Sequence, residues 1–296
     1  MNKSPLARKC LSQATRNALY LDCLNRKFDK VLKTVRSIPP KDMDYAFLQT
    51  YLARSCHWGH MASVSYIWYR YVLRSNVLII KASLLCDIGN LSLNEGNHFI
   101  PAQLHEYFSR IYGKSLPIEE RQSLDYELSR IKVESFAKGT INKTNFREKW
   151  KVFLEDIDHR FPSNMTFRAR DFPNLGRSLR HEENDLLMVL LFGQNKIAIH
   201  NASTGPLLLN LILMYSPQNA SFKISLFEKF YNAHRLLNYD DTVTILLQLC
   251  KGDPYNLEKI KKFAADNLVP SLSSMASKTP TNEITADTSK DFVKSR

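Results

Sequence analysis

The chain has 296 residues, 44% of them hydrophobic and 24% charged, which excludes a disordered chain and allows one large core or two smaller ones. Its formal net charge is +12, and the first hundred residues hold fourteen basic but only six acidic side chains. Such an excess favours a polyanionic partner such as nucleic acid, with an ordinary solvated basic surface as the alternative.

The five cysteines form no CxxC pair and no even framework of the kind that a small secreted domain needs. They are predicted to be reduced, buried thiols. No apolar run reaches the roughly 18 residues that a membrane-spanning helix needs, and the runs LLMVLLFG at 186 and GPLLLNLILMY at 205 have the length of core helices. The sequence therefore predicts a soluble or peripheral protein.

The first 21 residues, MNKSPLARKCLSQATRNALYL, contain the basic side chains Lys3, Arg8, Lys9 and Arg16, and no acid precedes Asp22. Ser, Thr and Gln separate short apolar residues in this segment. The composition is typical of a mitochondrial targeting segment, which is amphipathic and poor in acids. A basic first helix of the folded domain is the alternative.

Residues 22–160 show self-similarity at the spacing of a helical repeat. Three stretches each contain an apolar helical end, a short polar break and a second amphipathic run: CLNRKFDKVLKTVRS, CHWGHMASVSYIWYR and LNEGNHFIPAQLHEYF. The breaks centre on Lys27, Gly59 and Gly96, which are 32 and 37 residues apart. This is the length of the helical hairpins that stack into solenoids, so the breaks are predicted to be turns between helices.

Two of these stretches carry a resemblance to a known family. FLQTYLARSCHWGHMASVSYIW resembles a degenerate pentatricopeptide repeat, with a Thr six residues before a Cys, a Gly that closes the first helix, and a small-residue second helix. DDTVTILLQLCKGDPYNLEKIKKF repeats the arrangement near the other end. Over about residues 17–113, from NALYLDCLNRKFDKVLKTVRSIP to SLLCDIGNLSLNEGNHFIPAQLHEYFSRIYG, the chain is similar to the fungal mitochondrial translational activators of the cytochrome c oxidase subunit 3 mRNA.

The rest of the chain is also helical by pattern. SLPIEERQSLDYELSRIKVESF is predicted to be a helix capped by Ser115, and TNFREKWKVFLEDIDHRF places aromatic residues at helical spacing. Residues 161–176 are predicted to form a connecting loop, residues 177–270 a second helical region, and residues 271–296 a disordered tail. Strand-like alternation is scarce apart from NKIAIH at 195. The expected fold class is all-α, a solenoid of helical-hairpin repeats.

The residues that could bind a metal lie together at one of these turns. Cys56, His57 and His60 are suitable zinc donors, but a four-ligand site needs a second cluster, and none follows at a suitable spacing. We therefore favour a structural turn for this segment. The carboxylates at 182, 183 and 185 favour a solvated helix end, and no phosphate-binding, metalloprotease or nucleophile-elbow motif occurs. We expect no cofactor, no metal and no enzymatic activity.

The resemblance implies a function and a location. It implies an activator that binds the 5′ leader of one mitochondrial mRNA and the small ribosomal subunit, acts with other translational activators, and attaches peripherally to the matrix side of the inner membrane. The alternative is a structural or assembly protein of the mitochondrial ribosome, which would contact RNA without sequence preference. A helical enzyme is a third class, for which the sequence offers no catalytic pair.

The candidate RNA-binding residues come from two sources. In pentatricopeptide repeats the first helix faces the RNA and a short polar residue near its start reads a base, so the resemblance implies Thr50 and Thr244. Tyr66, Arg70 and Arg74 recur at a spacing of four, which places a ring and two cations on one helix face, as a single-stranded nucleic acid requires. Trp68 and Val72 fall on another face and are expected in the core. An ordinary surface Thr and a solvent-exposed or inter-repeat face are the alternatives.

Overall fold

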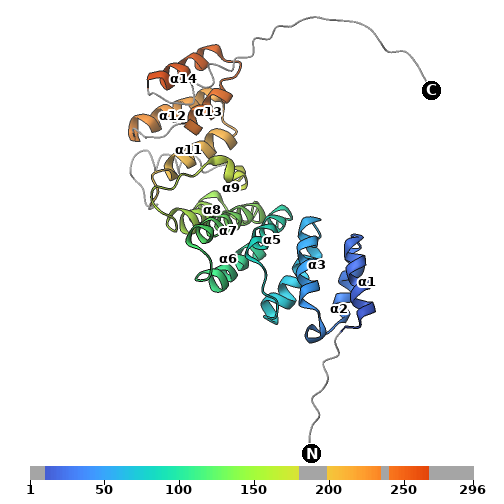
Figure 1. The fold of residues 1–296 in the computed structure, drawn as a ribbon. Coiled ribbons are helices and arrows are strands. Elements are labelled where there is room, and N and C mark those ends of the chain that lie inside the picture. The colour runs from blue at the N-terminus through green and yellow to red at the C-terminus, as the bar shows by residue number, and fades with distance from the viewer. Residues whose placement is uncertain (1–10, 180–198, 235–239, 267–296) are drawn as a thin grey trace, which may run out of the picture. The chain divides into compact units, whose positions relative to one another are not determined.

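The computed structural model describes residues 11–179, 199–234 and 240–266, and every regular element in these ranges is helical (Figure 1). The all-α prediction is confirmed. The chain forms two compact units, Met1–Pro217 and Gln218–Arg296. The predicted tail at 271–296 lies outside the described residues, and the predicted loop at 161–176 lies within the first unit. The predicted region boundaries stay predictions.

The first unit contains helical hairpins followed by a longer helix and shorter segments. Its elements are α1 (Gln13–Leu24), α2 (Phe28–Ser37), η1 (Pro40–Asp42), α3 (Tyr45–His57), α4 (Met61–Ile67), η2 (Trp68–Arg74), α5 (Ala82–Asn94), α6 (Phe99–Tyr112), α7 (Ile118–Gly139), α8 (Phe146–Phe153), η3 (Leu154–Asp158), η4 (Ala169–Asp171), α9 (Pro173–Arg177) and α11 (Thr204–Tyr215). The second unit contains α12 (Ala220–His234), α13 (Asp240–Leu249) and α14 (Pro254–Asp266).

The three predicted breaks are turns of one type. The chain enters the left-handed region at Arg26 (φ 59°), Gly59 (φ 73°) and Gly96 (φ 71°). In each turn the next backbone N–H donates to a carbonyl five residues earlier, which is the longer hydrogen bond of a Schellman motif. These bonds run from Lys27 to Asp22 (2.9 Å), from His60 to Ser55 (2.8 Å) and from Asn97 to Ser92 (2.9 Å). The predicted repeated turn is therefore confirmed.

The helices form because each buries an apolar stripe. In α2 the buried residues Phe28, Val31, Leu32 and Val35 follow the helical spacing of three and four. The first helices of successive hairpins lie together, since α3 contacts both α1 and α5, while α2 contacts α4. Apolar side chains of α1 to α6 join in one core. Trp68 and Val72 are fully buried in it, as their spacing predicts.

Caps fix where several helices begin. Asp44 accepts a hydrogen bond from the backbone N–H of Ala46 (2.9 Å) and caps α3. The predicted cap Ser115 is wrong, because its hydroxyl donates to the carbonyl of Ile111 (3.4 Å) in the preceding turn. Pro117 occupies the cap position of α7 instead and makes no side-chain bond there. Its fixed φ suits a residue just before a helix.

Two buried carboxylates hold the later helices of the first unit. Glu134 accepts backbone N–H groups of Asn174 (2.8 Å) and Leu175 (2.9 Å) at the start of α9. Burial raises the pKa of Glu134, while these donors partly offset that effect. Asp158 accepts the N–H of Asn201 (2.9 Å) and a bond from the Thr204 hydroxyl at the start of α11. Contacts far apart in sequence therefore set the position of these short helices.

Within the described ranges, none of the helices combines the length and the apolar character that a bilayer crossing requires.

Candidate nucleic-acid interface

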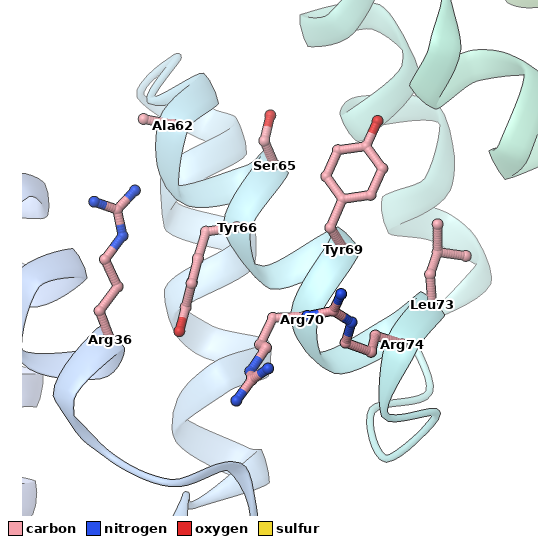
Figure 2. Close-up of a pocket in the computed structure, with 8 residues that line it drawn as sticks. All are labelled: Arg36, Ala62, Ser65, Tyr66, Tyr69, Arg70, Leu73 and Arg74. Atoms are coloured by element: carbon pink, nitrogen blue, oxygen red, sulfur yellow. The ribbon is translucent and has the colours of Figure 1, made fainter.

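A groove of about 840 Å³ lies between α2 and the continuous helix formed by α4 and η2 (Figure 2). The structure brings the predicted residues Tyr66, Arg70 and Arg74 together in this groove. Arg36 reaches it from α2, and Tyr69 joins from η2. The small side chains of Ala62 and Ser65 and the apolar Leu73 complete the lining. The site thus combines residues from two successive hairpins.

The continuous helix of α4 and η2 turns one face toward the groove, and the side chains on that face recur every three or four residues. Residues Trp68–Arg74 are π-helical, a form that is frequent at functional sites. The buried side chains of Trp68, Tyr71 and Val72 anchor its inner face, and the Trp68 indole N–H donates to Gln103 Oε1 (2.8 Å). Because these side chains fix the inner face of η2 in the core, the opposite face of η2 is held in place at the groove.

The end of η2 is fixed by further hydrogen bonds. The Ser75 hydroxyl donates to the carbonyl of Arg70 (2.7 Å). The backbone N–H groups of Val77 and Leu78 both donate to the carbonyl of Tyr71, at 3.1 and 3.2 Å. These bonds satisfy carbonyls that a helix end otherwise leaves open, so the backbone that carries Arg70 and Arg74 is well supported.

The two tyrosine rings of the groove differ in their surroundings. The Arg36 guanidinium lies 5.3 Å from the centroid of the half-buried Tyr66 ring, and the Tyr71 ring meets Tyr66 edge-on at 6.1 Å. Tyr69 is 41% exposed, and its partial burial raises the pKa of its phenol. Burial also raises the pKa of Tyr71 to about 12. The phenols of Tyr69 and Tyr71 are therefore neutral at physiological pH.

The groove is electropositive. Among the described residues that line it, none is acidic. The guanidinium groups of Arg36, Arg70 and Arg74 have no carboxylate within salt-bridge distance in the described part of the chain. Three arginines without counter-charges around one concave surface favour an anionic ligand, because guanidinium binds phosphate in bidentate geometry.

Arg36 and Tyr69 were not predicted from the sequence. Arg36 lies thirty residues before Tyr66, and only the packing of α2 against α4 brings the two together. The prediction used only the spacing of four and so omitted Tyr69, which lies three residues after Tyr66 on the same helix face. The residues that line the groove from this helix, from Ala62 to Arg74, all follow the spacing of three and four, so the sequence did carry a signal for Tyr69.

Thr50 lies in a different groove. This groove, of about 620 Å³, is formed by α3 and the start of α5 and shares no lining residue with the first. The half-buried Thr50 donates its hydroxyl proton to the carbonyl of Ala46 (3.1 Å). Arg54, Lys81 and Asp87 provide charges of both signs nearby. Base contact by Thr50 stays a prediction, and the structure separates it from the arginine groove.

Thr244 is half-buried on α13 in the second unit, beside the buried Val243. Its predicted contact with a base also stays a prediction.

The Cys and His cluster has other partners than a metal. Burial, with a smaller effect of Asp87, raises the pKa of the Cys56 thiol to about 12, so the thiolate that binds zinc is disfavoured. His57 packs edge-on against Trp58 at 5.0 Å. His60 pairs with the Ser63 hydroxyl (2.7 Å) and with Asp29 (3.1 Å). No group of three potential metal ligands occurs within the described ranges. The turn interpretation fits these contacts.

Two further sequence features fall outside the description. The carboxylates Glu182, Glu183 and Asp185 lie outside the described residues, as does most of NKIAIH at 195.

Comparison with known proteins gives consistent matches over most of the chain. The PET122 family model matches residues 7–267. The chain is 45% identical over 262 residues to Protein PET122, mitochondrial, of Lachancea kluyveri, which covers 88% of this chain and 83% of that protein. It is 31% identical over 239 residues to Protein PET122, mitochondrial, of Saccharomyces cerevisiae, covering 79% of this chain and 93% of that protein. The Saccharomyces bayanus protein of the same name is 32% identical over 251 residues, covering 81% and 95%.

Proposed function

The chain belongs to the PET122 family of mitochondrial translational activators, and we propose that it binds the 5′ leader of the cytochrome c oxidase subunit 3 mRNA and the small ribosomal subunit. The family resemblance seen in the sequence is confirmed. Members of this family are non-enzymatic regulators, and the relatives are named as mitochondrial proteins. Binding to this mRNA and to the small ribosomal subunit, and attachment to the inner membrane, are what we propose.

The acid-free groove between α2 and η2 is the observation that carries RNA binding. Its three arginines supply phosphate contacts, and its tyrosines supply faces for unstacked bases. The groove lies in the first hundred residues, which hold most of the net positive charge. Since counterion release drives binding to a polyanion, the groove and the surrounding charge act in the same direction.

The two grooves of the first unit suit different tasks. Phosphate contacts position RNA but carry little sequence information, whereas contacts to base edges select it. The arginine groove supplies contacts of the first kind. Thr50, on the first helix of its hairpin, has a hydroxyl and sits in a groove with polar neighbours, so it supplies contacts of the second kind in this proposal.

The remaining partners of the proposal are those that the resemblance in the sequence implies. The proposed complex includes other translational activators and attaches peripherally to the inner membrane on the matrix side. In that place an activator can hold a leader, a ribosomal subunit and the membrane near one another.

The second candidate function is a ribosome-associated structural or assembly protein without sequence selectivity. The composition of the arginine groove is compatible with this function, because guanidinium groups and tyrosine rings bind a single strand of any sequence. The two functions differ in whether a particular leader is preferred.

A salt titration of RNA affinity separates the two candidates. The full chain is titrated with the matched leader and with a scrambled leader of equal length, at several salt concentrations. Tighter binding of the matched leader throughout supports the activator, with selectivity that survives high salt because contacts to base edges release no counterions. Equal affinity for both leaders would remove selective leader binding and favour the ribosomal function.

A further inference from the structure

We propose that Tyr69 is the ring on which a base of single-stranded RNA stacks, while Tyr66 holds Arg36 in position for a phosphate. The inference rests on the proposed RNA binding and assigns separate roles within the arginine groove. It differs from the expectation from sequence, in which Tyr66 was the stacking ring and neither Arg36 nor Tyr69 took part.

Tyr66 is unsuited to base stacking because its ring is already packed. The Arg36 guanidinium lies over it at 5.3 Å, within the range of a cation–π contact. The Tyr71 ring abuts it at 6.1 Å with an interplanar angle of 76°. A base that stacks on the face under Arg36 would displace that side chain and so remove a cation from the groove.

Tyr69 has the opposite environment. Its side chain is 41% exposed, and it points in a different direction from Tyr66 (Figure 2). Among the described rings, none forms an aromatic pair with it. Its backbone belongs to η2, whose inner face is fully buried, so the ring is presented from a rigid support. An exposed ring on a rigid support loses little entropy when a base packs on it.

Arg36 is a third cation whose position is already restricted. It is exposed at the last turn of α2, where a free arginine would sample many rotamers. Packing over Tyr66 restricts them before a ligand arrives, which lowers the entropy cost of binding. Arg36 lines the groove from α2, whereas Arg70 and Arg74 line it from η2, so a strand in the groove meets guanidinium groups from two helices.

A single strand fits this groove better than a membrane surface does. Lipid headgroups would also meet the arginines, but membrane insertion needs a protruding apolar face. Here the charges and the exposed ring line a concave surface of about 840 Å³ with small side chains at Ala62 and Ser65. Anionic lipid is therefore an outcome to be tested and not the proposed ligand.

The test compares RNA with and without bases. Fluorescence anisotropy measures binding of the full chain to oligouridine and to an abasic phosphodiester strand of equal length. Tyr69→Ala is expected to weaken oligouridine binding about tenfold, as the loss of one stacked base does, and to leave abasic binding unchanged. Arg36→Gln is expected to weaken both and to reduce the salt slope by about 0.7, the value for one phosphate on a single strand.

Control variants make the result specific. Arg110 also lies over a tyrosine ring, 5.9 Å from the centroid of Tyr107, but outside the groove, so Arg110→Gln is expected to bind both strands like the native protein. Tyr66→Phe keeps the ring under Arg36 and is expected to bind both strands more tightly than a variant without the ring. Tyr66→Leu removes the ring and is expected to resemble Arg36→Gln, provided that its circular dichroism and melting match the native chain.

Several outcomes would overturn the assignment. Equal losses for both strands in Tyr69→Ala would show that Tyr69 is not a stacking ring, and a base-dependent loss in Tyr66→Leu alone would reverse the two roles. Tight binding to anionic vesicles with no binding to either strand would make the groove a lipid site. Oligouridine is not the leader, so this test does not depend on leader selectivity, and the selectivity titration can fail while these roles hold.

Discussion

The guanidinium group of Arg26 lies 3.4 Å from the centroid of the Trp58 ring, so the turn of the first hairpin is joined to the turn of the second. Arg26 has φ 59°, the left-handed conformation that glycine occupies in the two equivalent turns. A residue with a side chain is strained there by about 1–2 kcal/mol. Stacking on Trp58 offsets part of that strain, which gives a physical reason for a non-glycine residue at this position.

A double-mutant cycle tests this coupling. In the native background, Arg26→Gly is expected to change the free energy of unfolding little, because relief of strain and loss of the cation–π contact oppose each other. In a Trp58→Ala background, the same change is expected to stabilise the protein by about 1 kcal/mol. Urea denaturation of the four proteins measures it. Identical effects of Arg26→Gly in both backgrounds would show that the two residues are not coupled.

Gly59 offers a test of the repeated turn that involves backbone conformation alone. A Cβ added at Gly59 would meet no atom within 4 Å, so any cost arises from its φ of 73°. Gly59→Val is expected to lower the free energy of unfolding by about 1–2 kcal/mol, and Gly59→Asn by clearly less, since Asn tolerates the left-handed region. If the two variants were equally stable in thermal denaturation, strain at this turn would not be the cause.

The buried thiol of Cys56 predicts a loss of stability at alkaline pH. Its pKa in the fold is raised to about 12, mainly by burial, against about 8.5 in an unfolded chain. Below the lower value both states hold the proton and stability is complete. As pH rises from there toward 12, the unfolded state releases a proton that the folded state keeps, so stability falls.

Urea denaturation between neutral pH and about pH 10 tests this assignment. Cys56→Ala is expected to show a shallower fall in stability with pH than the native chain. Cys86 is half-buried and its pKa is raised, first by burial, to about 11, so Cys86→Ala is expected to have a comparable effect on the slope near pH 10. Unchanged slopes in Cys56→Ala would contradict the assignment. The same variant should leave the metal content of the purified protein unchanged.

Thr50 and the arginine groove are expected to respond differently to RNA sequence. Thr50→Val keeps the size of the side chain and removes its hydroxyl. If Thr50 reads a base, this variant should lose on the order of 1 kcal/mol of preference for the matched over the scrambled leader, with an unchanged salt slope. Arg70→Glu with Arg74→Glu should weaken binding to both leaders and flatten the salt slope. A Thr50→Val protein with native preference would make it an ordinary surface residue.

The basic N-terminal segment predicts import into mitochondria. Deletion of residues 1–21 is a poor test, because Leu19 of α1 is buried and would be lost with it. Reversal of charge at Lys3, Arg8 and Lys9 removes the basic character and leaves α1 intact. This variant is expected to be imported poorly by isolated mitochondria. A matched control reverses three exposed lysines elsewhere, Lys33, Lys114 and Lys143, and import equal to that control would contradict the prediction.

Local sequence determined the helices, their turns and the buried side of each helix. The breaks at Gly59 and Gly96 were predictable because glycine tolerates a positive φ and closes a helix within a few residues of chain. Trp68 and Val72 were predictable core residues, since helical spacing puts them on one apolar face. Family membership, too, followed from the sequence, through the stretches around these turns.

Only the tertiary structure decided how the hairpins meet. Arg36 reaches Tyr66 because α2 packs on α4, and Thr50 is separated from both because α3 packs on α5. Such contacts depend on how buried side chains of different hairpins interlock, and this long-range packing has no signature within a window of sequence. The π-helical form of Trp68–Arg74 is of the same kind: its packed inner face and the bonds to the Tyr71 carbonyl stabilise it, and local propensity does not encode it.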